Sequence, residues 1–420
     1  MTRLLDVYLH EKKAGKLQQA SNGQLSFTYN PDYLIESNQA ISISMPLTEA
    51  PYSDNIARPY FSGLLPDEHA RKRLAAALGV SAENPFKLLE IIGGECAGAL
   101  SLIPEGETLP NHHAGAFEPL SDKQLAQLLD DLRERPLLGG KDGVRLSLAG
   151  AQDKLAVCLI DDVITLPKDG RPTSHILKPF IEGLEGTVEN EVFCMRLAHR
   201  MGLNAPEVSK RTVESTDFIL IKRYDRLQDS NGMIRKLHQE DFCQALAVPP
   251  ELKYEDEGGP GITHCQTLIQ QSTRQPAADQ ITFQKMIIFH YLVGNADAHA
   301  KNYALLYRQN TPDLAPIYDV VNTAVYPRLS KNLAMKIGGR GRPDTIQLTH
   351  WHALVPETKT AQRLLASTMR QMAETIAPTA DVLLEDMQAE GTYHPILKTA
   401  GQIIKRRAQH IFRITDDLKP

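Results

Sequence analysis

Short stretches in which apolar or β-branched residues alternate with polar ones recur through the first hundred positions. Gly, Asn and Pro turns separate these stretches, which is typical of short strands in a β-rich domain. We expect strands over residues 4–9, 24–29 and 40–45. Residues 61–79 instead contain a predicted helix, with Pro66 and Asp67 suited to its first turn and Gly79 to its C-terminal cap. The pattern predicts an N-terminal β-rich domain over residues 1–105.

A second region follows a stretch without periodicity. Residues 106–120 are rich in Pro, Gly and His, and we interpret them as a linker. Its neighbouring His112 and His113 are expected to be solvated, with a metal-binding pair as the alternative. Residues 185–202 repeat apolar side chains at helical spacing, which predicts an amphipathic helix packed on a sheet. Around this helix we expect a helix over 121–135 and strands over 154–160, 175–180 and 218–222.

Beyond about residue 235 the helical period dominates. Helices are expected over residues 239–247, 266–271, 282–293, 360–376, 380–389 and 400–412. The chain therefore divides into the N-terminal domain, a strand-rich lobe over 121–235 and a helix-rich lobe over 236–420. The predicted fold class is α+β.

The charge is unevenly distributed along the chain. Lys and Arg total 46 and Asp and Glu total 51, a net charge of −5 that argues against a polycation for nucleic acid. Residues 328–420, however, hold 14 Lys or Arg and 9 Asp or Glu, so they carry +5 against −10 on the rest. This basic segment is either ordinary variation of surface charge or a face that meets phosphate or an acidic partner.

The remaining composition is that of a globular protein, with 42% hydrophobic and 23% charged residues. The five cysteines are widely spaced without a CxxC pair, so we expect reduced thiols. The first residues carry charges throughout, which is unlike a signal peptide. The longest apolar runs are far shorter than a membrane span of about 20 residues. We expect a cytoplasmic protein without a membrane partner.

The most informative segment is GNADAHAKN, where Asp297 and Asn302 stand five positions apart after an apolar helix. Phosphoryl transfer needs a carboxylate for the proton of the attacking hydroxyl and a neutral oxygen that holds Mg²⁺ on the phosphates, and this spacing supplies both. Asp319, expected on a short apolar strand, is a candidate second metal-binding carboxylate. Such residues also form turns and helix caps. His299 is a poor metal ligand because no second ligand stands at the required spacing.

Features upstream complete the requirements of a kinase site. The small residues between Ser147 and Lys154 let backbone N–H groups approach phosphate oxygens, although a plain hairpin turn has the same composition. Lys178 ends a strand, where its ammonium group would hold the phosphates. Glu191 on the following helix is a candidate to orient Lys178, with solvent exposure as the alternative for it and for Glu189. The ordered combination is more specific than any single part.

Longer motifs extend this pattern over residues 1 to about 340. They are ISISMPL, FSGLLPDE, IGGECAGALSLIPEG, SLAGAQDK, HILKPF, NEVFCMRLA, KRYDR, QEDFCQAL, YEDEGGPG, NADAHAKN and PIYD. Through these motifs the chain resembles the HipA family of serine/threonine kinase toxins. The resemblance implies that the N-terminal β-rich domain precedes a two-lobed protein-kinase-like core with a helical C-terminal lobe, and that ATP and Mg²⁺ are the cofactors.

The resemblance also implies roles for individual residues. Asp297 looks like the general base, and Asn302 and Asp319 look like the magnesium ligands. Ser147 matches the family's autophosphorylated serine, whose phosphate is thought to eject the loop and switch the kinase off. The added negative charge, where the phosphates of ATP should bind, agrees with this. The implied nucleotide-binding positions are Ala149, Gly150, Ala151, Gln152, Asp153, Lys154, Lys178, Lys222, Arg223, Tyr224, Asp225, His299, Ala300, Lys301, Asn302, Tyr318 and Asp319.

A member of this family is expected to act in a bacterial toxin–antitoxin pair. The implied partner is a HipB-like helix-turn-helix antitoxin dimer, through which the complex binds operator DNA, associates with the nucleoid and represses its own operon. The implied substrate is glutamyl-tRNA synthetase, whose phosphorylation stalls translation and promotes growth arrest and persistence. Lys359 and Arg363 are candidate DNA contacts, with a solvated helix face as the alternative.

Two departures from ordinary protein kinases agree with the HipA pattern. Val320 and Val321 follow Asp319 in place of a DFG motif, and His299 replaces the lysine usual two residues after the catalytic Asp. One rival function is a small-molecule kinase of the aminoglycoside phosphotransferase type, against which the N-terminal domain and the SLAGAQDK serine argue. The other is a nucleotide-binding corepressor with little kinase activity, against which the complete set of catalytic residues argues.

Overall fold

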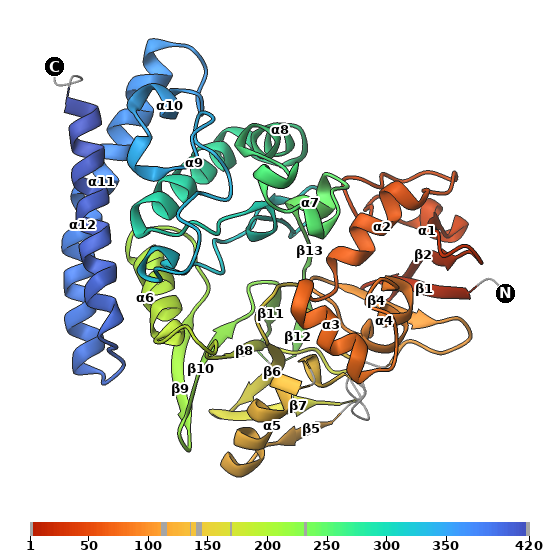
Figure 1. Ribbon diagram of the computed structural model, residues 1–420. Helices are drawn as coiled ribbons and strands as arrows, with labels where there is room; N and C mark the ends of the chain where they lie inside the picture. Colours follow the sequence, from red (N-terminus) through yellow and green to blue (C-terminus); the bar gives the residue numbers. More distant parts are fainter. Residues whose placement is uncertain are drawn as a thin grey trace. The chain divides into compact units, whose positions relative to one another are not determined.

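The computed structural model describes residues 3–110, 116–134, 136–139, 145–168, 170–230 and 233–416. The linker histidines His112 and His113 lie outside the described residues. The chain forms two compact units, whose elements are labelled in Figure 1. The first unit comprises Met1–Pro179, Arg211–Glu251 and Ala304–Asp313, and the second comprises Phe180–Lys210, Leu252–Tyr303 and Leu314–Pro420.

The first unit opens with an antiparallel sheet in the order β3-β2-β1-β4. Leu25, Phe27 and Tyr29 alternate inward along β3, as the two-residue period of a strand requires, and their side chains enter the core. The strands are β1 (Arg3–Leu9), β2 (Lys12–Gln19), β3 (Leu25–Tyr29) and β4 (Leu100–Pro104), and the helices are α1 (Pro31–Glu36), α2 (Asp54–Gly63), α3 (Glu68–Ala77) and α4 (Pro85–Ile92).

A six-stranded sheet in the order β5-β7-β6-β8-β10-β9 holds the expected lysine strand. Lys178 of β8 lies opposite Ile219 of β10 in the antiparallel register. The strands are β5 (Phe117–Pro119), β6 (Leu155–Ile160), β7 (Val163–Pro167), β8 (His175–Pro179), β9 (Val208–Val213) and β10 (Thr216–Lys222). Also present are α5 (Asp122–Glu134), η1 (Pro136–Leu138), β11 (Arg226–Gln228), β12 (Ile234–Lys236), β13 (His238–Asp241), α7 (Phe242–Ala245), β14 (Ala304–Tyr307) and β15 (Asp313–Leu314).

The second unit is built from helices. Its α9 begins with Pro276 at its first turn and ends at Gly294, whose φ of 80° lets the chain turn sharply into the following loop. Figure 1 shows α12 running alongside α11, and Lys405 pairs with Asp381 between them at 2.9 Å. The helices are α6 (Thr187–Arg200), α8 (Ile262–Ser272), α9 (Pro276–Val293), α10 (Leu348–His352), α11 (Lys359–Ala389) and α12 (Ile396–Thr415).

Short 3₁₀ turns connect these elements. They are η2 (Pro250–Leu252), η3 (Glu255–Glu257), η4 (Ala300–Asn302), η5 (Thr323–Val325) and η6 (Pro343–Thr345). Among the residues that the structure describes, none of the helices is long and apolar enough to cross a membrane. All five cysteines are buried and free, as the sequence predicts.

The α+β fold class is confirmed, whereas several element boundaries are wrong. Residues 40–45 form turns instead of a strand. The helix expected within residues 61–79 is confirmed as α3, with Asp67 as its N-cap and Gly79, at φ of 65°, just after its end. Residues 238–241 form β13, so only Phe242–Ala245 remains of the expected helix over 239–247. Residues 360–376 and 380–389 form one helix, α11, which continues through Pro378. The expected linker contains β5, and residues 316–319 form no strand.

Candidate active site

The D-x-x-x-x-N segment of the second unit forms a loop that folds back on itself. Asn302 Nδ2 donates to the backbone carbonyl of Asp297 at 3.0 Å, and the His299 N–H donates to the same carbonyl at 2.8 Å. These two bonds close a short turn, which holds the Asn302 amide close to the backbone of Asp297. The Asp297 side chain is exposed, whereas His299 and Asn302 are each only 6% exposed. The loop thus exposes the Asp297 carboxylate, while the side chains of His299 and Asn302 beneath it are buried.

The loop is also anchored from behind, by the end of α9. Asn295 Oδ1 accepts the Asp297 N–H at 2.9 Å, and Asn295 Nδ2 lies 3.1 Å from His290 Nδ1. Complete burial lowers the pKa of His290 to about 3, so this imidazole is neutral and its Nδ1 can accept the amide proton. A cavity of about 20 Å³ is lined by both side chains, which is room for one water molecule. The α9 terminus therefore sets the backbone position of Asp297.

Asp319 follows an extended, irregular segment. Its backbone is left-handed, with φ of 57°, and its side chain is half-buried. The preceding Tyr318 donates its hydroxyl to the Lys301 carbonyl at 2.6 Å, which ties this segment to the catalytic loop. Asn302 and Asp319 offer amide and carboxylate oxygens, the donor chemistry that Mg²⁺ prefers. Within the described residues, no group of three or more His, Cys, Asp or Glu side chains forms a separate metal site.

The expected phosphate loop lies in the first unit, against the N-terminal domain. Gly150 has φ of 112°, and its carbonyl accepts the Asp67 N–H at 3.1 Å. Arg73 binds Asp153 at 2.5 Å, and Lys154 Nζ donates to the Ala149 carbonyl at 2.7 Å. The ammonium group of Lys154 thus lies beside the loop backbone, where its positive charge would attract an anion such as a phosphate group.

Ser147 stands just before this loop and is completely buried. Its hydroxyl donates to the Leu64 carbonyl at 2.7 Å, and its N–H donates to the Glu95 carbonyl at 2.8 Å. A phosphate on Ser147 has no room in this arrangement. Phosphorylation of this hydroxyl would require the loop to leave the N-terminal domain.

Lys178 and the two helix glutamates are all buried, which excludes the solvent-exposed interpretation of Glu189 and Glu191. Glu189 pairs with Lys210 at 2.5 Å, within the second unit. Lys178 belongs to the first unit and Glu191 to the second. The proposed orientation of Lys178 by Glu191 stays a prediction.

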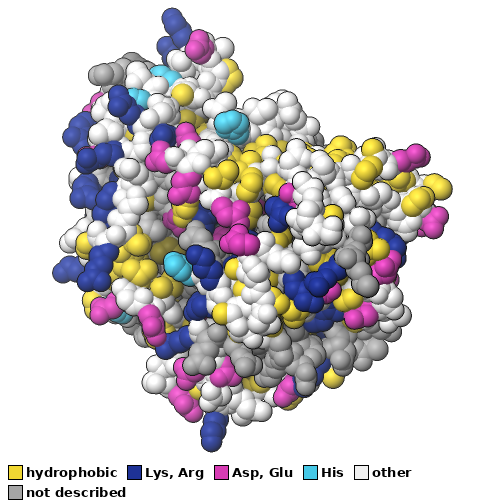
Figure 2. Space-filling model, turned by 45° about the vertical axis from the view of Figure 1, so that its right-hand side comes forward, with side chains coloured by type: hydrophobic (Ala, Val, Ile, Leu, Met, Phe, Trp, Pro, Cys, Tyr) yellow, Lys and Arg dark blue, Asp and Glu magenta, His cyan; other side chains and the backbone are white. Residues whose placement is uncertain are grey.

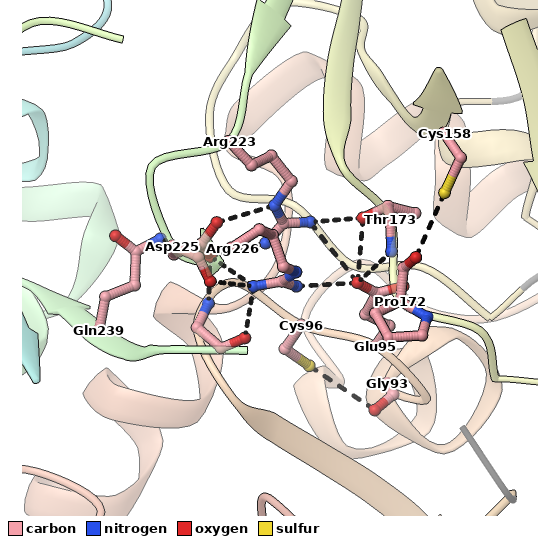
Figure 3. A network of polar contacts seen from close by, with 11 residues as sticks. Gly93, Glu95, Cys96, Cys158, Pro172, Thr173, Arg223, Asp225, Arg226 and Gln239 are labelled. Atoms are coloured by element: carbon pink, nitrogen blue, oxygen red, sulfur yellow. Dashed lines mark hydrogen bonds and ion pairs between the residues drawn. The ribbon is translucent and has the colours of Figure 1, made fainter. Parts of the chain in front are cut away.

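The family resemblance implies that Lys222, Arg223 and Tyr224, with Asp225 nearby, form the connector that binds adenine. The side chains of Arg223 and Asp225 in this connector face the N-terminal domain (Figure 3). Arg223 binds Asp225 through two nitrogens, at 2.9 and 2.7 Å, and Arg226 binds Glu95 at 2.8 Å. Arg223 also donates to the Thr173 hydroxyl at 3.0 Å. The side chains of Arg223 and Asp225 are therefore engaged in this network, and the nucleotide-binding role of Lys222, Arg223, Tyr224 and Asp225 stays a prediction.

The electrostatics of this network favour ionised carboxylates despite burial. Burial alone would raise the pKa of Glu95, but Lys236, Arg226 and Arg223 outweigh it and bring the pKa down to about 2. Burial likewise opposes the charge on Asp225, and the two arginines beside it hold its pKa well below the usual range. The network is thus a buried set of ion pairs that couples residue 95 to the connector.

The C-terminal candidates lie on the surface. Lys359 and Arg363 are exposed on the first turns of α11. In Figure 2, Lys and Arg side chains gather along the left-hand edge, on the side where Figure 1 draws α11 and α12. The exposed basic residues of α12 are Lys398, Lys405, Arg406 and Arg413.

Two residues of the site were missed by sequence reasoning. Tyr254 donates its hydroxyl to Asp297 Oδ1 at 2.9 Å, and Glu95 holds the connector network. Both stand in recognised motifs, YEDEGGPG and IGGECAGALSLIPEG, but far along the chain from their partners. Only the three-dimensional fold reveals these contacts.

Comparisons with known proteins agree with the fold. Residues 146–380 match the HipA-like C-terminal domain, and residues 5–103 match the HipA N-terminal domain. A putative kinase, Y4mE of Sinorhizobium fredii, is 40% identical over 91% of this chain and 92% of its own. The serine/threonine-protein kinase toxin HipA of Shewanella oneidensis is 28% identical, over 91% and 90% respectively.

A solved structure extends the likeness to almost the whole fold. It is the Shewanella oneidensis complex of HipA, HipB and operator DNA, which matches with a TM-score of 0.85 at 24% identity, over 99% of both chains. The fold and these relatives define a protein kinase. More specifically, the chain belongs to the HipA family.

Proposed function

We propose that the protein is an ATP- and Mg²⁺-dependent serine/threonine kinase that acts as the toxin of a toxin–antitoxin pair. The catalytic loop carries this proposal, because it presents an accessible carboxylate at Asp297 and anchors the Asn302 amide beside it. Asp297 accepts the proton of the attacking hydroxyl. Lys178 and the Ala149–Lys154 loop bind the phosphates of ATP. Asn302 and Asp319 would hold Mg²⁺, which neutralises charge on the phosphates.

Replacing Asp297 with Asn tests the catalytic assignment. The variant keeps the size and the backbone contacts of the loop but removes the proton acceptor, so we expect phosphate transfer from ATP to fall by at least about 100-fold. Transfer is measured with radiolabelled ATP, and phosphate on Ser147 is located by mass spectrometry. Asp386→Asn, which loses only an exposed ion pair with Arg200, is the matched control. Full activity of the Asp297 variant would refute the function.

Autophosphorylation of Ser147 is part of the same proposal. The buried hydroxyl and its bond to Leu64 support a two-state loop: an inward state that binds ATP and an outward state in which the serine is reached. A phosphate brings about −1.5 to −2 charges, which would repel the phosphates of ATP if the loop returned. Wild-type protein incubated with ATP and Mg²⁺ should gain phosphate on Ser147 and lose activity, and an unmodified serine after incubation contradicts this regulation.

We further propose a HipB-like helix-turn-helix antitoxin dimer as the partner, with operator DNA bound through the complex. The Shewanella oneidensis complex, in which HipA is found with HipB and operator DNA, supports this partnership. The proposed substrate is a translation factor, by family resemblance glutamyl-tRNA synthetase. Phosphoproteomics after induced expression, compared with the Asp297→Asn variant, identifies the substrate. Phosphorylation of other proteins but not of this synthetase would reject that substrate while leaving the kinase assignment intact.

A further inference from the structure

Tyr254 contacts Asp297, the proposed general base. The phenol donates to Asp297 Oδ1 at 2.9 Å, across 43 positions of the chain and within the second unit. Asp297 is exposed, and a hydrogen bond to one of its oxygens restrains the plane of the carboxylate. The last torsion of an aspartate side chain has a broad energy minimum and is otherwise weakly restrained.

Tyr254 is itself held in place by its neighbours. The imidazole of His299 meets its ring edge-on, with centroids 5.1 Å apart. The ammonium group of Lys253 lies 5.3 Å from the same ring centroid, and Lys253 is only 3% exposed. Aromatic and cation–π contacts of this kind orient a ring as well as burying it. The hydroxyl therefore reaches Asp297 from a fixed ring.

The backbone beside Tyr254 and the backbone beside Asp297 are joined through Ala334. The Ala334 N–H donates to the Ala296 carbonyl at 2.8 Å, and the Ala334 carbonyl accepts the Glu255 N–H at 3.2 Å. Glu255 in turn accepts the Lys336 N–H at 2.6 Å through its carboxylate. Ala296 and Glu255 are the immediate neighbours of Asp297 and Tyr254. These backbone hydrogen bonds thus hold the segments that carry the phenol and the carboxylate near each other.

We propose that Tyr254 is a positioning residue for the general base. Its hydroxyl binds Oδ1 and directs Oδ2 of Asp297 toward the attacking hydroxyl; this rests on the proposed function. In that step the acceptor oxygen bonds to the γ-phosphorus of ATP, and the bond from this phosphorus to the β–γ bridging oxygen breaks. The proton passes to Asp297, and ADP leaves with the electron pair. A rotated carboxylate would meet the hydroxyl in the wrong geometry, which slows the step without affecting ATP binding.

The Tyr254→Phe variant tests the inference in the full-length protein. It removes the hydroxyl and keeps the ring against His299. We expect kcat for ATP consumption to fall about tenfold, because general-base catalysis depends on alignment. The dissociation constant for ATP, from calorimetry, and the melting temperature should stay unchanged. Tyr33→Phe is the matched control, since it loses a part-buried hydroxyl bond to the Gln39 carbonyl at 2.7 Å in the first unit.

The outcomes separate this inference from the proposed function. A kcat within twofold of wild type, alongside an inactive Asp297→Asn variant, overturns the role of Tyr254 and leaves the kinase assignment intact. A lower kcat accompanied by weaker ATP binding or a lower melting temperature also overturns it, because general loosening of the loop then explains the loss. An active Asp297→Asn variant overturns the proposed function itself. A selective loss of kcat supports the positioning role.

Discussion

Asp319 adopts a backbone conformation that most residues avoid. Its φ of 57° lies in the left-handed region, which Asn, Asp and Gly visit more readily than residues with larger side chains. The Tyr318 hydroxyl, bound to the Lys301 carbonyl at 2.6 Å, holds the residue just before it. Strained residues of this kind persist where surrounding contacts determine them, and they are common in ligand-binding sites.

Replacing Asp319 with Ala should therefore have two separable effects. Loss of the carboxylate should weaken ATP binding at least tenfold when Mg²⁺ is present and leave it unchanged in EDTA. The alanine should also cost about 1 kcal/mol of stability, because its backbone resists a positive φ. Asp319→Asn tolerates this backbone and removes only the charge, so it isolates the metal effect. Calorimetry with and without Mg²⁺ measures both variants, and equal affinities for all three proteins would exclude the metal role.

At the scale of elements, local signals predicted more than non-local ones. The α9 helix and the spacing from Asp297 to Asn302 were predictable, because helix period and loop chemistry act over a few residues. The strands β13 and β14 were not, since residues 238–241 pair with 304–307, more than sixty positions away. Tyr254 and Glu95 were missed for the same reason. Their partners are brought near only by tertiary folding.

The buried network of Glu95 gives a pH-dependent prediction at this scale. Its pKa is about 2 in the folded chain against 4.5 for a solvated glutamate, so its stabilisation is present above pH 4.5 and lost as the pH falls toward 2. The linkage amounts to about 3 kcal/mol. Glu95→Gln should lower stability at pH 7 by about 3 kcal/mol, because Arg226 loses one of its two buried carboxylate partners and keeps only Asp225.

The measurement is the thermal or urea midpoint of both proteins from pH 7 down to pH 3. Wild type should lose stability steadily below pH 4.5, and Glu95→Gln should show a flatter dependence. Glu105→Gln is the control: its pair with Lys16 at 2.6 Å is exposed, so its loss should change stability by less than about 1 kcal/mol. A variant as stable as wild type at pH 7 would show that the network does not support the connector.

At the scale of the whole molecule, the uneven charge along the chain affects how the proposed complex would bind DNA. The chain carries a net charge of −5, yet residues 328–420 carry more Lys and Arg than Asp and Glu. An acidic body is repelled by DNA, so the proposed antitoxin must supply most of the binding and base recognition. We propose that exposed lysines and arginines such as Lys359 and Arg363 would add contacts to DNA phosphates, which carry no sequence preference.

Lys359→Ala combined with Arg363→Ala tests these contacts in the complex with the antitoxin and operator. If each contacts one phosphate, the slope of log K against log salt should fall by about 2, with affinity reduced alike for operator and unrelated DNA. Kinase activity should be unchanged. Lys12→Ala with Lys123→Ala removes the same charge from exposed positions of the first unit and is the control. An unchanged salt slope would leave these two side chains as part of a solvated helix face.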